Sequence, residues 1–321
     1  MAEDRNVLEQ RAMALLQKGK MEDALQAYQA VLKIAPRDIR IRQKLADLSL
    51  QLGRKPEAMR YLREVALGHI SEDQHRPAIV VLKQLYGLKP KDDEVTGLLG
   101  DCYKKTGFVQ DAREWFEKTL EILDDSPKEA LPWASKLVDV CPGEMPPKIS
   151  YAELLNRAGK FDVAFGHWVR LGQEARRRGN AGDQALFNER ALRIEEESLE
   201  CLESAAEARI AMGQAKEALV HIQKAYGANP ESDSVLLMLA QCFELLEQPA
   251  NAKKVFLQLA NVLADMNDPV RRREALERAL ICDKDDAELQ GLVGAAVARA
   301  ERAQLRLNDG EWSQPQSQEE A

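Results

Sequence analysis

Apolar residues recur at helical spacing along nearly the whole chain. Residues 12–36 read AMALLQKGKMEDALQAYQAVLKIAP, with an apolar stretch on each side of Gly19 and a proline, Pro36, at the end. Apolar positions three and four residues apart are typical of amphipathic helices that pack on one face. Glycine and proline mark the points where helices end. The segment therefore predicts two antiparallel helices joined at Gly19.

The same frame recurs along the chain at three positions coupled to each turn. The turn residues are Gly19, Gly53, Gly107, Gly159, Gly213 and Glu247. Seven residues before each turn stands a small residue: Ala12, Ala46, Gly100, Ala152, Ala206 and Ala240. Five residues after it stands an alanine: Ala24, Ala58, Ala112, Ala164, Ala218 and Ala252. Nine residues after it stands a large apolar residue: Tyr28, Leu62, Phe116, Trp168, Ile222 and Phe256.

This coupling predicts a helical hairpin in every copy. The small residues let two helix backbones approach closely, and the large apolar residue fills the space beside them. A seventh, partial copy places Gly294 in the small position. One hairpin cannot bury its own apolar face, so we expect the copies to stack into one array.

The frame resembles the tetratricopeptide repeat family over roughly residues 5–300. The resemblance implies an all-α fold, a right-handed superhelical α-solenoid of antiparallel helix hairpins. That family repeats about every 34 residues. Here the interval is 34 residues from Gly19 to Gly53, but 54 from Gly53 to Gly107. The excess of about 20 residues corresponds to one further helix and a turn.

Four segments are candidates for these further helices: 74–89, 127–140, 183–195 and 271–282. The chain is therefore predicted to be a variant, bacterial-type array that mixes two-helix and three-helix units, with about sixteen to eighteen helices. An odd helix reverses the direction of the helices after it, so the concave groove of a regular array is expected to be interrupted. We expect a single extended domain over residues 1–303. Residues 304–321 are polar, and we expect a disordered tail.

Composition narrows the class of partner and the compartment. The chain has 45 Lys and Arg against 53 Asp and Glu, a net charge of −8, which disfavours nucleic acid as a partner. No apolar run approaches the roughly 18 residues of a membrane span, and the N-terminus lacks the pattern of a signal peptide. The 5 cysteines include no CxxC pair. Free thiols are typical of a reducing compartment, so we expect a cytoplasmic protein.

The sequence holds no recognisable catalytic constellation. Phosphate-binding glycine loops, nucleophile elbows and zinc-protease motifs are absent. The 4 histidines lack metal-ligand spacing with cysteines or carboxylates. Cys102 and Cys242 each stand five residues before a turn, a shared position that favours helix packing. We therefore expect no catalysis, no cofactor and no metal, with a redox or metal role for cysteine as the alternative.

The resemblance also implies where a ligand would bind. In this family the first helix of each unit supplies ligand contacts, at positions thirteen, ten, six, three and two residues before the turn. In the fourth copy these positions include Glu153, Asn156 and Arg157. In the fifth they include Glu200, Glu203 and Glu207.

The second set forms an acidic stripe, because residues spaced three and four apart share a helix face. Such a stripe would attract a partner segment bearing Lys or Arg. The alternative is a solvated helix face.

Arg271, Arg272 and Arg273 are a further candidate contact. They stand near the start of a predicted helix, where cations do not suit the positive end of the helix dipole. The placement favours a contact with an acidic partner or with a neighbouring glutamate. Trp312, in the polar tail, is a candidate docking residue, with folding back on the last unit or no role as alternatives.

These observations favour a non-catalytic scaffold or adaptor that binds proteins or peptides. Proteins of this type resemble scaffolds for bacterial signalling kinases and for motility or secretion assemblies. The alternatives are a self-assembling structural protein and, less favoured, a redox protein or enzyme that uses Cys or His. Neither the oligomeric state nor the partner follows from the pattern.

Overall fold

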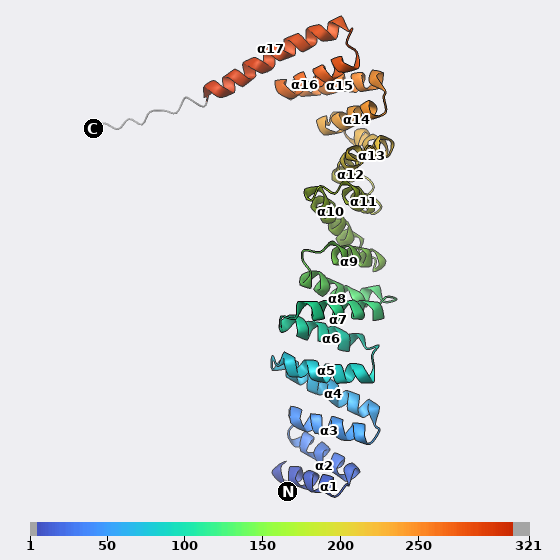
Figure 1. The fold of residues 1–321 in the computed structure, drawn as a ribbon, viewed down its shortest axis with the longest axis vertical. Helices are drawn as coiled ribbons and strands as arrows, with labels where there is room; N and C mark the ends of the chain where they lie inside the picture. The colour runs from blue at the N-terminus through green and yellow to red at the C-terminus, as the bar shows by residue number, and fades with distance from the viewer. Residues whose placement is uncertain (1–4, 311–321) are drawn as a thin grey trace, which may run out of the picture. The chain divides into compact units, whose positions relative to one another are not determined.

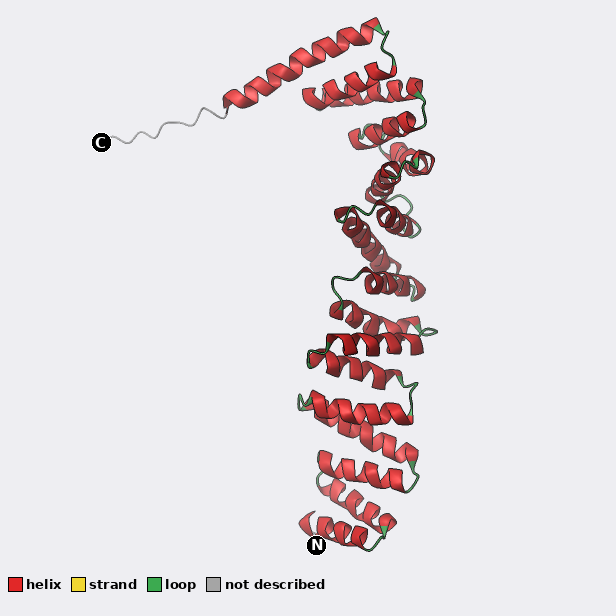
Figure 2. Ribbon diagram, in the orientation of Figure 1, coloured by secondary structure: helices red, strands yellow, loops and turns green. Residues whose placement is uncertain are grey.

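The computed structural model describes residues 5–310, including the side chains of residues 5–302, and all the regular structure in that range is helical (Figures 1 and 2). The chain forms two compact units, Met1–Lys160 and Phe161–Ala321. The 17 helices lie within the predicted number, and the predicted all-α repeat array is confirmed.

Nine helices belong to the first unit: α1 (Arg5–Gln17), α2 (Met21–Ile34), α3 (Ile39–Gln51), α4 (Lys55–Ser71), α5 (His75–Leu88), α6 (Asp93–Lys105), α7 (Val109–Ile122), α8 (Pro127–Val140) and α9 (Met145–Arg157). Eight belong to the second: α10 (Phe161–Arg177), α11 (Ala181–Leu192), α12 (Leu199–Ala211), α13 (Ala215–Ala228), α14 (Asp233–Leu245), α15 (Pro249–Asp265), α16 (Pro269–Cys282) and α17 (Ala287–Gly310). Within each unit, each helix packs against the next along the chain.

The coupled positions of the sequence frame form the core. Every small residue of the six full copies, and every alanine and large apolar residue coupled to it, is buried. The five glycines at the turns have φ between 72° and 82°, a backbone region in which glycine carries no Cβ penalty. The sixth turn places Glu247 at φ 55°. The frame therefore predicts both the core and the turns.

The four further helices are α5, α8, α11 and α16. For α8 the predicted bounds are correct, and those of α5 and α16 differ by one or two residues at an end. Helix α11 begins two residues earlier and ends three residues earlier than predicted. Its N-cap is Asn180, whose side chain accepts a hydrogen bond from the Asp183 amide at 3.1 Å.

Three of these helices, α5, α11 and α16, follow a turn at which the same frame occurs again. The sequence analysis missed this second occurrence. Helices α4, α10 and α15 have 17 residues each and are followed by turn residues with positive φ: Asp73, Gly179 and Asn267. Seven residues before each of these turns stands another buried small residue: Ala66, Gly172 and Ala260. Each long helix thus closes one hairpin and opens the next. Helix α8 is the exception, because the turn before it has no residue with positive φ.

The last helix departs from two expectations. Gly294 was expected to pack in the small position, but no atom lies within 4 Å of the place its Cβ would take, because no described helix follows α17 to cover it. The predicted domain boundary at residue 303 falls inside α17. Trp312 and the rest of the predicted tail beyond residue 310 lie outside the described residues.

Candidate partner-binding surfaces

Helix α12 brings the predicted acidic stripe into a groove of the second unit. Glu200, Glu203 and Glu207 line a cavity of 430 Å³ together with residues of α10, α11, α14 and α16. Half-buried Leu237 and Met238 of α14 supply its apolar lining. We call this cavity the α12 groove. It confirms that the three carboxylates share one face, as their spacing predicts.

Each carboxylate of the α12 groove already has a partner within the chain. Gln173 donates to Glu200 at 2.8 Å, and Ser234 donates to Glu203 at 3.0 Å. Arg176 forms an ion pair with Glu207 at 2.7 Å. The first two partners are neutral, so the charges of Glu200 and Glu203 are not cancelled by them. Arg176, in contrast, supplies a built-in counter-ion at one end of the stripe.

The three arginines at the start of α16 do not act together. Arg271 lines the α12 groove and pairs with Asp233 at 2.6 Å, while its amide donates to the N-cap residue Asp268. Arg273 contacts Glu277 one turn along its own helix, at 3.5 Å. The Nε atoms of Arg272 and Arg273 are buried and have no hydrogen-bond partner. Of the three, only Arg271 lines the α12 groove, while Arg273 has the contact with a neighbouring glutamate that the sequence interpretation offered as one of two options.

A buried amide network supports the groove from below, and sequence reasoning missed it. Gln184 and Asn188, one turn apart on α11, both hydrogen-bond the Ser204 hydroxyl, at 3.2 and 3.0 Å. Gln184 also donates to Glu207 at 3.2 Å. A Cβ on Gly172 would lie 2.5 Å from the Asn188 amide nitrogen, so only glycine leaves room for this network. The signal available in the sequence was a pair of amide side chains, Gln184 and Asn188, four residues apart in one predicted helix.

Glu153, Asn156 and Arg157 lie on α9 in the first unit. Glu153 and Arg157 line a cavity of 220 Å³ that Asn156 does not border. Arg157 donates to an Asp124 carboxylate oxygen at 3.0 Å and to the Asp124 carbonyl. The side-chain oxygen of Asn156 is buried without a hydrogen-bond partner. The predicted residues therefore divide into two sets, one in each unit.

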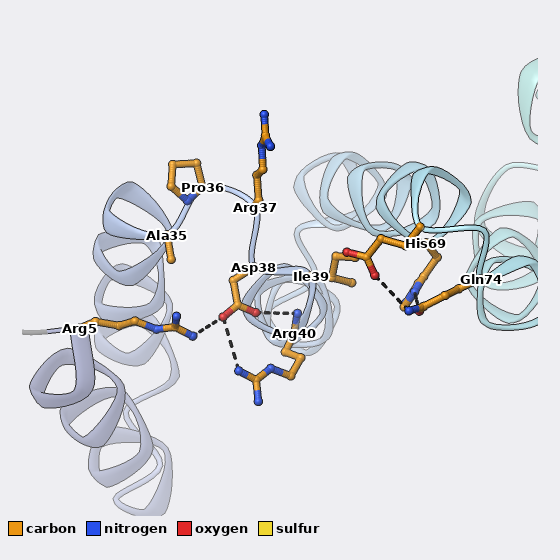
Figure 3. A pocket seen from close by; sticks show the side chains of 10 residues that line it. Arg5, Ala35, Pro36, Arg37, Asp38, Ile39, Arg40, His69 and Gln74 are labelled. Carbon is orange, nitrogen blue, oxygen red and sulfur yellow. Dashed lines mark hydrogen bonds and ion pairs between the residues drawn. The ribbon is translucent and has the colours of Figure 1, made fainter.

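A cleft of 720 Å³ in the first unit was not predicted (Figure 3). Asp38 caps α3 by accepting from the amides of Arg40 and Ile41, and its carboxylate also pairs with Arg5 of α1. His69 contacts the Gln74 side chain at 2.9 Å on the other side of the cleft. Asp38 thereby ties the first helix to the start of the third, which is a structural role.

The cysteines occupy packing positions. Burial raises the pKa of Cys102 and of Cys242 to about 11. Burial also raises the pKa of Cys141, Cys201 and Cys282. A raised pKa keeps the thiol neutral, which disfavours both nucleophilic attack and metal binding. Within the described residues, no group of three or more His, Cys, Asp and Glu side chains has the geometry to hold a metal ion.

Two models of known protein families match parts of this chain. Residues 15–68, from the end of α1 to α4, match the model of the tetratricopeptide repeat. Residues 15–68 carry a tetratricopeptide repeat. The matched stretch of the repeat array includes the turn at Gly53 and the packing residues around it. Residues 175–281 match the model of a bacterial transcriptional activator domain.

Several solved structures resemble the repeat array. The P58(IPK) TPR domain is 15% identical, with 88% of this chain and 90% of that one covered and a TM-score of 0.34. The TPR2AB domain of yeast Sti1 in complex with pHSP90 is 14% identical, covering 87% and 98%, with a TM-score of 0.33. Pseudomonas aeruginosa pilF is 13% identical, covering 80% and 91%, with a TM-score of 0.26. No curated protein matches the sequence. Within the described part of the chain, none of the helices combines the length and apolar character that a bilayer crossing requires.

Proposed function

We propose that this protein is a non-catalytic scaffold of the cytoplasm that binds a partner protein through a Lys- or Arg-bearing segment in the α12 groove. The observation that carries the proposal is the meeting of Glu200, Glu203 and Glu207 in one cavity beside apolar Leu237 and Met238. Three carboxylates face two guanidiniums there, so the lining keeps an acidic excess. Apolar contact gives a partner affinity, and the acidic excess selects its charge.

The match to a bacterial transcriptional activator domain supports a place in a bacterial regulatory assembly. It spans residues 175–281, which include α11, α12, α14 and α16 of the groove. We place the scaffold in a signalling assembly, such as one built around a protein kinase, with a motility or secretion assembly as the second candidate. The neutral, buried thiols favour a non-catalytic role over a redox one.

The proposal is tested by fluorescence anisotropy with a labelled peptide of Lys and Ala, which carries charge but no large apolar side chain. We expect saturable binding that weakens as salt rises. Changing Glu200, Glu203 and Glu207 together to Lys should weaken binding by about tenfold or more. The matched control changes Glu195, Glu196 and Glu197 to Lys, three exposed residues just before α12 that do not line the groove.

One further variant distinguishes binding in the α12 groove from general attraction of a basic peptide to the acidic protein. Arg176→Ala removes the built-in counter-ion of Glu207, so the Lys and Ala peptide should bind more tightly. Equal losses in the groove variant and in the control would contradict the proposed site. So would binding that does not respond to salt.

A further inference from the structure

The first unit contains a second groove, built on α8. Two cavities of 540 and 220 Å³ share Leu120, Asp124 and Ser150, so they form one continuous hollow. One face of α7 and one face of α9 line its sides, and Ala130, Ala134 and Leu137 of α8 lie between them. We call this hollow the α8 groove.

The α8 groove exists because α8 joins the array differently from the other additional helices. Of the turns that precede the four additional helices, the one at residues 123–126 lacks a residue with positive φ. Leu123, Ala130, Ala134 and Leu154 form a small apolar cluster that meets the main core of the first unit through Leu120 and Trp133. Small side chains at 130 and 134 leave the hollow that a larger residue would fill.

Two ion pairs hold the ends of the groove. Arg113 of α7 reaches Glu144, just before α9, at 3.0 Å. At the other end, Arg157 of α9 reaches Asp124, just after α7, at 3.0 Å. From Arg113 to Asp124 the groove spans eleven residues, or about 16 Å of helix. An ion pair therefore links the two flanks of the groove at each end.

The rim of the groove is acidic. Glu117, Glu121, Asp124 and Glu153 line it, against Arg113 and Arg157. Arg113 pairs with Glu117 of the rim at 2.8 Å as well as with Glu144, and Arg157 pairs with Asp124. Four carboxylates against two guanidiniums leave the lining with an acidic excess. Glu121 is exposed on the side of α7. Ala130 and Ala134 are themselves buried, so the apolar lining open to an incoming segment is half-buried Leu120 and exposed Pro146. The segment therefore meets carboxylates at the edge and these two apolar side chains inside.

We propose that the α8 groove binds an amphipathic basic segment of a partner protein, with one large apolar side chain placed against Leu120 and Pro146 and Lys or Arg beside Glu121. The apolar base supplies the anchor, and the acidic rim selects the charge of its neighbours. This inference extends the proposed scaffold function to a second partner segment. It does not depend on the α12 groove.

The test uses the full chain with Glu200, Glu203 and Glu207 changed to Lys, so that the α12 groove no longer takes a basic probe. The probe is a labelled 14-residue peptide of Leu and Lys arranged with helical periodicity, measured by fluorescence anisotropy. We expect one saturable site per chain. A peptide with its Leu residues replaced by Ala should bind at least tenfold more weakly, and so should a Leu and Glu peptide.

Ser150→Trp blocks the groove from its rim, because Ser150 is exposed and borders both cavities. It should weaken binding of the Leu and Lys peptide at least tenfold. Lys128→Trp is the matched control, exposed on α8 and outside the groove. Glu121→Lys should weaken the Leu and Lys peptide and strengthen the Leu and Glu peptide.

Two results would overturn the inference. One is equal binding by the Ser150→Trp and Lys128→Trp proteins, each shown to be folded by circular dichroism. The other is equal affinity for the Leu and Lys and the Leu and Glu peptides. Failure of the proposed function is a separate result, because it concerns the α12 groove and the Lys and Ala peptide.

Discussion

At the residue scale, the repeat frame acts through the volume of single side chains. A Cβ on Gly100 would lie 2.6 Å from a ring carbon of Phe116, its coupled partner nine residues after the turn. Gly294, in the same position of the partial copy, meets nothing within 4 Å. The same residue type in the same position of the frame therefore has opposite packing, depending on whether a described side chain such as Phe116 packs against it.

Gly100→Ala and Gly294→Ala should change stability in opposite directions. Overpacking against Phe116 should lower the free energy of unfolding by about 1–3 kcal/mol. Alanine at 294 should raise it by about 0.5–1 kcal/mol, because glycine is the poorer helix former. Urea unfolding followed by circular dichroism measures both. Equal and small changes would mean that the frame does not set the packing.

The cysteines should react slowly in the folded protein. With a pKa of about 11, Cys102 and Cys242 carry about one thiolate in a thousand at pH 8. Alkylation by iodoacetamide, followed by mass spectrometry, should therefore label Cys282, which is only half-buried, before either of them. In denaturant all five should react alike. Rapid native labelling of Cys242 would favour the redox alternative.

At the element scale, the array depends on turns that require a left-handed residue. Glycine holds six of these positions, while Asp73, Glu247 and Asn267 hold three at φ between 55° and 59°. Asn and Asp tolerate this region better than other residues do. Glu247 is therefore the turn residue that costs stability.

Glu247→Gly should stabilise the protein by about 0.5–1 kcal/mol, the strain relieved at φ 55° less the added freedom of glycine in the unfolded chain. Gly213→Ala, at φ 74°, should have the opposite sign. Thermal unfolding of the two variants beside the parent checks this. Destabilisation by Glu247→Gly would show that the Glu247 side chain contributes more than its backbone strain costs.

The element scale also shows what the sequence predicts and what it does not. The turns and the six coupled copies were predictable because each depends on residues close together in the chain. The second use of the frame in α4, α10 and α15 went unrecognised because only one of its three turns carries glycine. The amide network of α11 and the α8 groove depend on contacts between helices, which a local pattern does not encode.

At the scale of the whole molecule, the helices of each unit give different faces to different grooves. The predicted stripe on α12 is confirmed as one face, but Glu153 and Arg157 belong to another unit and another groove. Self-assembly stays the alternative to partner binding.

The central claim is that the protein is a scaffold whose α12 groove binds a basic segment of a partner. Quantitative affinity purification from an extract of its source cells tests this most directly. It compares the unchanged protein, the variant with Glu200, Glu203 and Glu207 changed to Lys, and the control at Glu195, Glu196 and Glu197. We predict a stoichiometric partner that the unchanged protein and the control both recover and that the groove variant loses. Recovery of no reproducible partner, or equal recovery by all three proteins, would contradict the account.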